Sequence, residues 1–87
     1  MIEKLINQYV NKLTLTEIKE FAKTNGIIIN NDVAKLIYKY IKNDWHTIVY
    51  GNARPILDEI KKQIDLETYL KIETLYIDFK QKYQDYL

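Results

Sequence analysis

The sequence predicts an all-α fold, a single small domain of four to five helices over residues 1–87. Apolar residues recur at spacings of three and four along most of the chain, which is the period of an amphipathic helix. Residue types that cap helices, such as Thr14, Asn30 and Asp65, precede these segments. A chain of 87 residues can form one hydrophobic core and is too short for two.

The first expected helix begins at the N-terminus and packs one face against the core. The residues that share this face are Ile2, Leu5, Ile6, Tyr9, Val10 and Leu13. A helix lying on a membrane surface is the alternative, but the opposite face lacks the basic excess of such helices.

The second helix is expected over about residues 15–25. Thr14 and Glu17 have the spacing of a capping box, in which each side chain accepts a hydrogen bond from the other residue's backbone N–H. Gly26 stands where a left-handed residue ends a helix.

Residues 27–29 are three isoleucines, and we expect them to form an extended connection that fills the core. The basis is that β-branched residues after a glycine favour extended backbone. Asn30 or Asn31 is then expected to cap a third helix that ends near Asn43.

Residues 44–51 favour extended structure, because Thr47, Ile48 and Val49 are β-branched. Asn52 is expected to cap a fourth helix, with Pro55 at its third position, where the missing N–H is tolerated.

Asp65 is expected to cap the last helix. Its apolar seam consists of Tyr69, Ile72, Tyr76, Phe79, Tyr83 and Tyr86. We expect Tyr40, Tyr69 and Tyr76 to lie at the rim of the core with their hydroxyl groups in solvent.

The composition argues against an enzyme. The chain has no Cys and no Ser, so a disulfide scaffold, a zinc finger and the commonest nucleophiles are excluded. His46 is the sole histidine, and Asp44 is its only local candidate partner, so we interpret His46 as a surface or partly packed residue at a helix end. The scattered carboxylates have no metal-ligand spacing and neither glycine belongs to a phosphate-binding loop, so no catalytic residue, metal, cofactor or small-molecule ligand is expected.

Charge and hydropathy limit the remaining classes. The 13 basic and 12 acidic residues nearly cancel, which disfavours a general nucleic-acid binder. The longest apolar run is residues 27–29, far short of a membrane span, and no basic segment precedes an apolar run as in a signal peptide. We therefore expect a cytoplasmic protein without a membrane partner.

The pattern resembles the YqfT-like family of short uncharacterised proteins from low-GC bacteria. The resemblance extends from Leu5 to Tyr83 and lies in apolar positions and caps. Its elements are Leu15-Thr16-Glu17-Ile18, Phe21 to Ile27, the helix around Ala34, the block Ile48…Gly51-Asn52…Ile56…Glu59-Ile60, and Thr68…Ile72…Leu75…Phe79. The resemblance implies a small all-helical protein and carries no active-site residues.

Residues 13–44 also resemble the helix–extended-loop–helix modules of the SAP and LEM type, some of which bind DNA and others proteins. The matching frame is Leu15…Glu17-Ile18-Lys19…Asn25-Gly26-Ile27…Ala34…Leu36-Ile37. Five lysines and four acids give this unit a charge of only +1, so nucleic-acid binding is the alternative and not the leading hypothesis.

The leading hypothesis is a non-catalytic protein-interaction module, self-association included. The end of the last helix has few expected neighbours and is rich in tyrosine, a residue enriched at protein contacts. The candidate interface consists of Tyr76, Phe79, Tyr83, Tyr86 and Leu87. Residues 65–87 carry a charge of −2 and residues 1–64 a charge of +3, which suits an antiparallel self-contact or a basic partner.

Overall fold

The structure, a computed structural model, describes residues 2–86, which form five α-helices, a short 3₁₀ turn and no β-strand. The expected all-α class is confirmed. The helices are α1 (Ile2–Lys12), α2 (Leu15–Thr24), α3 (Asn31–Tyr50), α4 (Arg54–Gln63) and α5 (Leu66–Tyr83), and the turn is Gln84–Tyr86.

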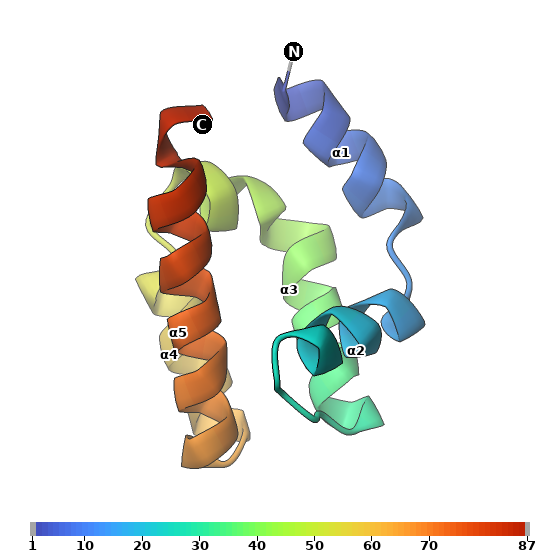
Figure 1. The fold of residues 1–87 in the computed structure, drawn as a ribbon, viewed down its shortest axis with the longest axis vertical. Coiled ribbons are helices and arrows are strands. Elements are labelled where there is room, and N and C mark those ends of the chain that lie inside the picture. The colour runs from blue at the N-terminus through green and yellow to red at the C-terminus, as the bar shows by residue number, and fades with distance from the viewer. Residues whose placement is uncertain (1, 87) are drawn as a thin grey trace.

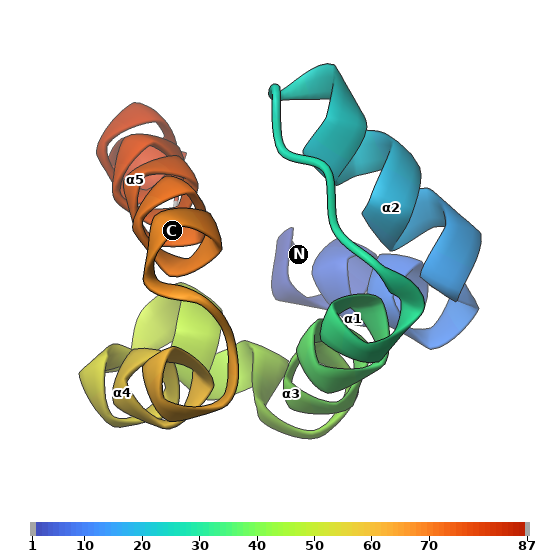
Figure 2. The ribbon, with the colours of Figure 1, turned by 90° about the horizontal axis from the view of Figure 1, so that it is seen from below.

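The long helix α3 lies between two groups of helices (Figures 1 and 2). It contacts α1 and α2 on one side and α4 on the other, and α5 packs beside α4. Each group has its own hydrophobic cluster. The first contains Leu13, Ile18, Ala22, Ile27, Ile29 and Ala34, and the second contains Leu57, Ile60 and Tyr69. Leu75 of α5 packs against the first cluster, so α5 contributes to both.

Helix α1 packs on the core along one edge only. Val10 is its buried residue, whereas Ile2, Leu5 and Tyr9 are exposed. The prediction that this stripe faces the core is therefore wrong for half of its residues, namely Ile2, Leu5 and Tyr9. The short helix meets α3 and no other helix closely, so one edge of its apolar face finds neighbours and the other does not.

Both ends of α2 form as the sequence predicts. Thr14 Oγ1 accepts from the Glu17 N–H at 3.2 Å, and the Glu17 carboxylate accepts from the Thr14 N–H at 3.1 Å. At the other end Gly26 has φ +80°, and the N–H groups of Gly26 and Ile27 donate to the carbonyls of Lys23 and Ala22. This is a Schellman motif, which satisfies the last carbonyls of the helix.

The extended connection is present, but only two of its isoleucines reach the core. Ile27 and Ile29 are buried, whereas Ile28 is 78% exposed. Successive side chains of an extended segment point to opposite sides, so three consecutive residues cannot share one core. Asn30 then caps α3 through a hydrogen bond from the Val33 N–H.

Helix α3 continues through residues 44–50, where the β-branched residues favour extended structure. The backbone leaves the helical region at Asp44, with φ −128° and ψ 19°, and helix resumes after this kink. The expected end near Asn43 therefore matches the kink and not the end of the helix. Burial of Val49 outweighs intrinsic propensities that differ by only about half a kilocalorie per residue.

The start of α4 lies one residue later than expected. Ala53 is the N-cap, Pro55 occupies the second helical position, and the Asn52 side chain accepts from the Arg54 N–H at 3.0 Å. Ala53 is buried, so a small apolar residue occupies the cap position. The side-chain acceptor comes instead from Asn52, one position earlier in the chain. Asp65 caps α5 as expected, accepting from the Thr68 N–H at 2.9 Å.

Replacing Gly26 tests the termination of α2. A Cβ at this position meets no atom within 4 Å, so Gly26→Ala adds only the cost of a left-handed backbone, about 1–2 kcal/mol. We expect urea unfolding to show a loss of stability of this size. Gly26→Asn is the matched variant and should lose less, because asparagine tolerates this conformation better. Equal stability of all three proteins would contradict the assignment.

Candidate interaction surface

Helix α5 is held in place by two tyrosines on its inner face. Tyr69 is only 1% exposed and packs against Leu57 and Ile60 of α4. The Tyr76 hydroxyl donates to the Ile48 carbonyl of α3 at 3.1 Å. The expected position at the rim of the core is correct for Tyr40 and Tyr76, which are half-buried against the second cluster, and wrong for Tyr69, which is enclosed in that cluster. The Tyr69 hydroxyl is partnered within the chain, because burying an unsatisfied hydroxyl is costly.

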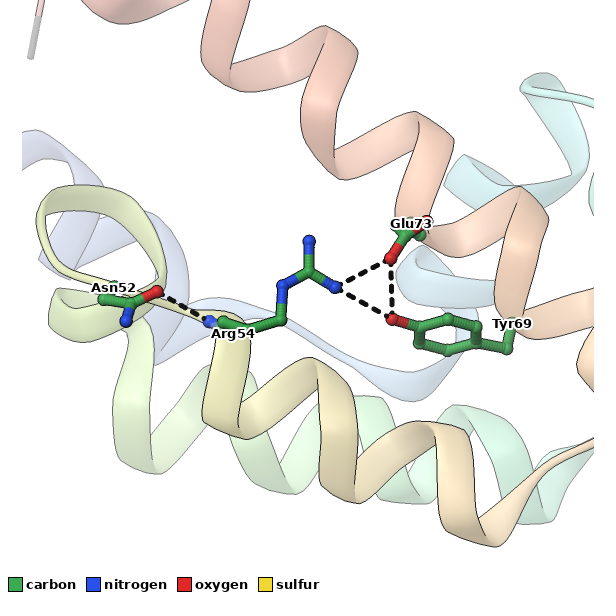
Figure 3. Close-up of polar contacts among 4 residues, drawn as sticks. All are labelled: Asn52, Arg54, Tyr69 and Glu73. Carbon is green, nitrogen blue, oxygen red and sulfur yellow. Dashed lines mark hydrogen bonds and ion pairs between the residues drawn. The ribbon is translucent and has the colours of Figure 1, made fainter.

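Tyr69 belongs to a polar cluster that joins α4 to α5 (Figure 3). Its hydroxyl lies 2.9 Å from Glu73 Oε2 and 3.3 Å from Nη1 of Arg54, which itself lies 2.7 Å from the same carboxylate oxygen. The Arg54 and Tyr69 hydrogen bonds hold the pKa of the Glu73 carboxyl below its ordinary value. Burial, followed by the hydrogen bond to Glu73, raises the pKa of Tyr69. Sequence spacing does not reveal this cluster, since Glu73 and Arg54 lie on different helices.

The predicted interface residues occupy different environments. Tyr76 is half-buried and faces α3. Phe79 is half-buried and its ring centroid lies 5.2 Å from that of Tyr83, which is 39% exposed. The side chain of Tyr86 and the whole of Leu87 lie outside the described residues. Phe79 and Tyr83 are thus brought together at the end of α5.

A second set of apolar residues lies on the outer face of α5. Leu66, Leu70 and Ile77 are 56%, 48% and 40% exposed. At 100° per residue they fall within about 40° of one another, and we call them the outer stripe. The tyrosine seam, which lies on another face of the helix, does not reveal this stripe. Apolar residues on two faces of one helix were the available signal.

A row of charged side chains lies beside the outer stripe. Its members are Glu67, Lys71, Asp78 and Lys82, all exposed. Lys71 Nζ lies 3.8 Å from a Glu67 oxygen within the helix, and Lys82 lies over the Tyr83 ring. Thr74 separates the two halves of this row. Because these groups face water, their charges are available to another molecule.

A shallow groove of about 430 Å³ borders the same helix. One wall is formed by Asn25, Gly26 and Ile27, and the α5 residues that form the other are Leu70, Lys71, Thr74, Leu75 and Asp78. In both ribbon views α5 lies at an edge of the molecule, with α4 beside it (Figures 1 and 2). The outer stripe and the groove therefore share Leu70 as a common residue.

His46 lies on the surface, as expected, but its partner is not Asp44. Its Nε2 lies 2.5 Å from a Glu3 carboxylate oxygen of α1, and both side chains are more than half exposed. Among residues 2–86, no three His, Cys, Asp or Glu side chains are grouped so that they could hold a metal ion. None of the helices in the same range has the length and apolar character needed to cross a membrane.

The helix–extended-loop–helix geometry of residues 13–44 is present, and its lysines have different roles. Lys19 donates to the Asn31 side chain, and Lys42 donates to the Val10 carbonyl near the end of α1. Lys35 and Lys39 are exposed and line a second shallow groove with Asp32 and Asp65, which offset their charge.

The fold and this surface define a small all-helical protein with an apolar, charge-bordered helix face. The chain belongs to a family described as "Protein of unknown function (DUF2624)", whose model matches residues 1–80. No curated protein and no solved structure matches the chain. The expectation that the chain belongs to a family of small uncharacterised proteins is thus confirmed.

The Glu73 cluster predicts a pH dependence of stability. The Glu73 pKa is lowered in the folded chain, so its contribution is fully present above the ordinary value of 4.5 and is lost as pH falls through the folded pKa. We expect Glu73→Gln to remove this part of the acid destabilisation in urea unfolding at several pH values. Asp65→Asn serves for comparison, because the pKa of Asp65 is also lowered, by its bonds to Thr68. An unchanged pH profile in Glu73→Gln would contradict the role of the cluster.

Proposed function

We propose that the protein is a non-catalytic interaction module that binds other protein chains through α5. The observation that carries this proposal is the outer stripe, three aliphatic side chains aligned on one exposed helix face. Single exposed apolar residues are ordinary, whereas an aligned set rimmed by charge is typical of a contact surface. An apolar helix face gains free energy when a partner removes it from water.

The end of α5 carries a second apolar group, turned by more than about 100° around the helix from the outer stripe. Phe79 and Tyr83 form an aromatic pair there, and aromatic side chains contribute strongly to protein contacts. Tyr76 supports the surface indirectly, because its hydrogen bond to Ile48 holds α5 against α3. We also propose that the chain is similar to the YqfT-like family, that it comes from a low-GC bacterium and that it is located in the cytoplasm.

Two features support a role without catalysis. The chain lacks the serine and cysteine nucleophiles, and His46 pairs with Glu3 on an open surface instead of within a groove. The polar cluster of Arg54, Tyr69 and Glu73 connects two helices, which is a structural task.

Nucleic-acid binding through residues 13–44 is the second candidate, and the exposed Lys35 and Lys39 favour it. A gel-shift series over salt tests it, because binding through phosphates must weaken steeply as salt rises. We expect no salt-sensitive complex. A complex that weakens steeply with salt and is lost in Lys35→Glu/Lys39→Glu would instead favour this candidate.

Affinity capture tests the leading proposal. Immobilised wild type should retain protein from an extract of the cells that produce it, and Leu70→Asp or Tyr83→Asp should retain roughly tenfold less of the same proteins. Phe21→Asp is the matched control, since Phe21 is an exposed apolar residue on α2 that does not belong to an aligned apolar set. The retained proteins are identified and quantified by mass spectrometry. Equal retention by the wild type and both α5 variants, or retention of nothing, would overturn the proposal.

A further inference from the structure

We propose that α5 binds α5 of a second copy of this chain, antiparallel, about a two-fold axis beside Thr74. This inference rests on the proposed function, because it uses the same helix face and specifies its partner. A symmetric dimer of this kind requires that one surface be complementary to itself. The charged row on α5 has this property.

The signs of the row alternate in a particular order. Glu67 and Asp78 are negative and Lys71 and Lys82 are positive, so the row reads minus, plus, minus, plus from one end and the opposite from the other. When two copies run antiparallel, Glu67 of one helix faces Lys82 of the second copy, and Lys71 faces Asp78. All four pairs between the two copies then join opposite charges. A parallel arrangement would instead place each charge opposite its own sign, which disfavours it.

The same two-fold arrangement also brings the apolar residues together. The axis is perpendicular to the plane of the two helices, so the charged rows meet on one side of the contact and the outer stripes meet on the other. Leu70 of one copy then lies within about half a turn of Ile77 of the second copy. Thr74 is at the centre, where its short side chain allows the helices to approach closely.

The size of the contact predicts a weak dimer. Helix α5 has 18 residues and is therefore about 27 Å long. A single helix pair of this length falls in the class of small, transient interfaces below about 1,200 Å². Within one copy, Lys71 and Glu67 form an exposed ion pair, which contributes little and can exchange for partners on the second copy. The dimer should therefore form at micromolar or higher concentration.

Charge reversal gives a direct test by sedimentation velocity over a concentration series. Lys71→Glu alone and Asp78→Lys alone each place two like-charged pairs across the contact, and each should weaken the dimer roughly tenfold. The double variant Lys71→Glu/Asp78→Lys should recover it. An equimolar mixture of the two single variants should also form dimers, because each then meets opposite charges. All positions are exposed, and circular dichroism checks that the helices persist.

The apolar half of the contact is tested with Leu70→Asp, which should also weaken the dimer, while Phe21→Asp on α2 should not. A wild type that stays monomeric up to several hundred micromolar would overturn the inference, as would a dimer insensitive to both charge reversal and Leu70→Asp. If the wild type is monomeric while capture of other proteins still depends on Leu70, self-association is wrong and the proposed function stands. If capture is absent as well, both are wrong.

Discussion

The orientation of α5 depends on the burial of one tyrosine. Tyr69 is the largest side chain that is almost fully enclosed within residues 2–86, and a phenol can be buried at this depth only when its hydroxyl has a partner. Glu73, one turn further along α5, supplies the acceptor, and Arg54 balances its charge from the start of α4. The requirement to satisfy one hydroxyl thus joins two helices and directs Leu70 and Ile77 outward.

Two lysines connect the remaining elements across long sequence distances. Lys42 donates to the Val10 carbonyl at the end of α1, and Lys80 donates to the Val49 carbonyl at the end of α3. Both ammonium groups meet the negative end of a helix dipole, where a positive charge is favourable. These contacts join α1 and α5 to α3 through polar groups, in addition to the two hydrophobic clusters.

The sequence predicts those parts of the fold that depend on local chemistry. The capping box at Thr14, the left-handed Gly26 and the cap at Asp65 each involve residues within five positions, and all three are correct. The behaviour of residues 44–50 and the exposure of Ile28 depend on packing between distant segments. Local propensities of a few tenths of a kilocalorie per residue cannot determine them.

The candidate surface likewise has one part that the sequence predicts and one part that depends on packing between helices. The aromatic pair at the end of α5 is visible in the spacing of Phe79 and Tyr83, whereas the outer stripe is recognisable only once the inner face of the helix is known. The role of Tyr76 could not be read from the sequence, because its hydrogen-bond acceptor is a carbonyl 28 positions away.

The thin attachment of α1 has a consequence for the dynamics of the native state. Val10, Leu13 and two polar contacts from α3 hold this helix, while half of its apolar face remains in water. Detaching it removes little buried surface, so it can open without unfolding the rest of the chain. Its amide hydrogens should therefore exchange with solvent through a local opening of low free energy, well before those of α3 and α5. Resistance to unfolding is thus a property that differs from helix to helix along the chain.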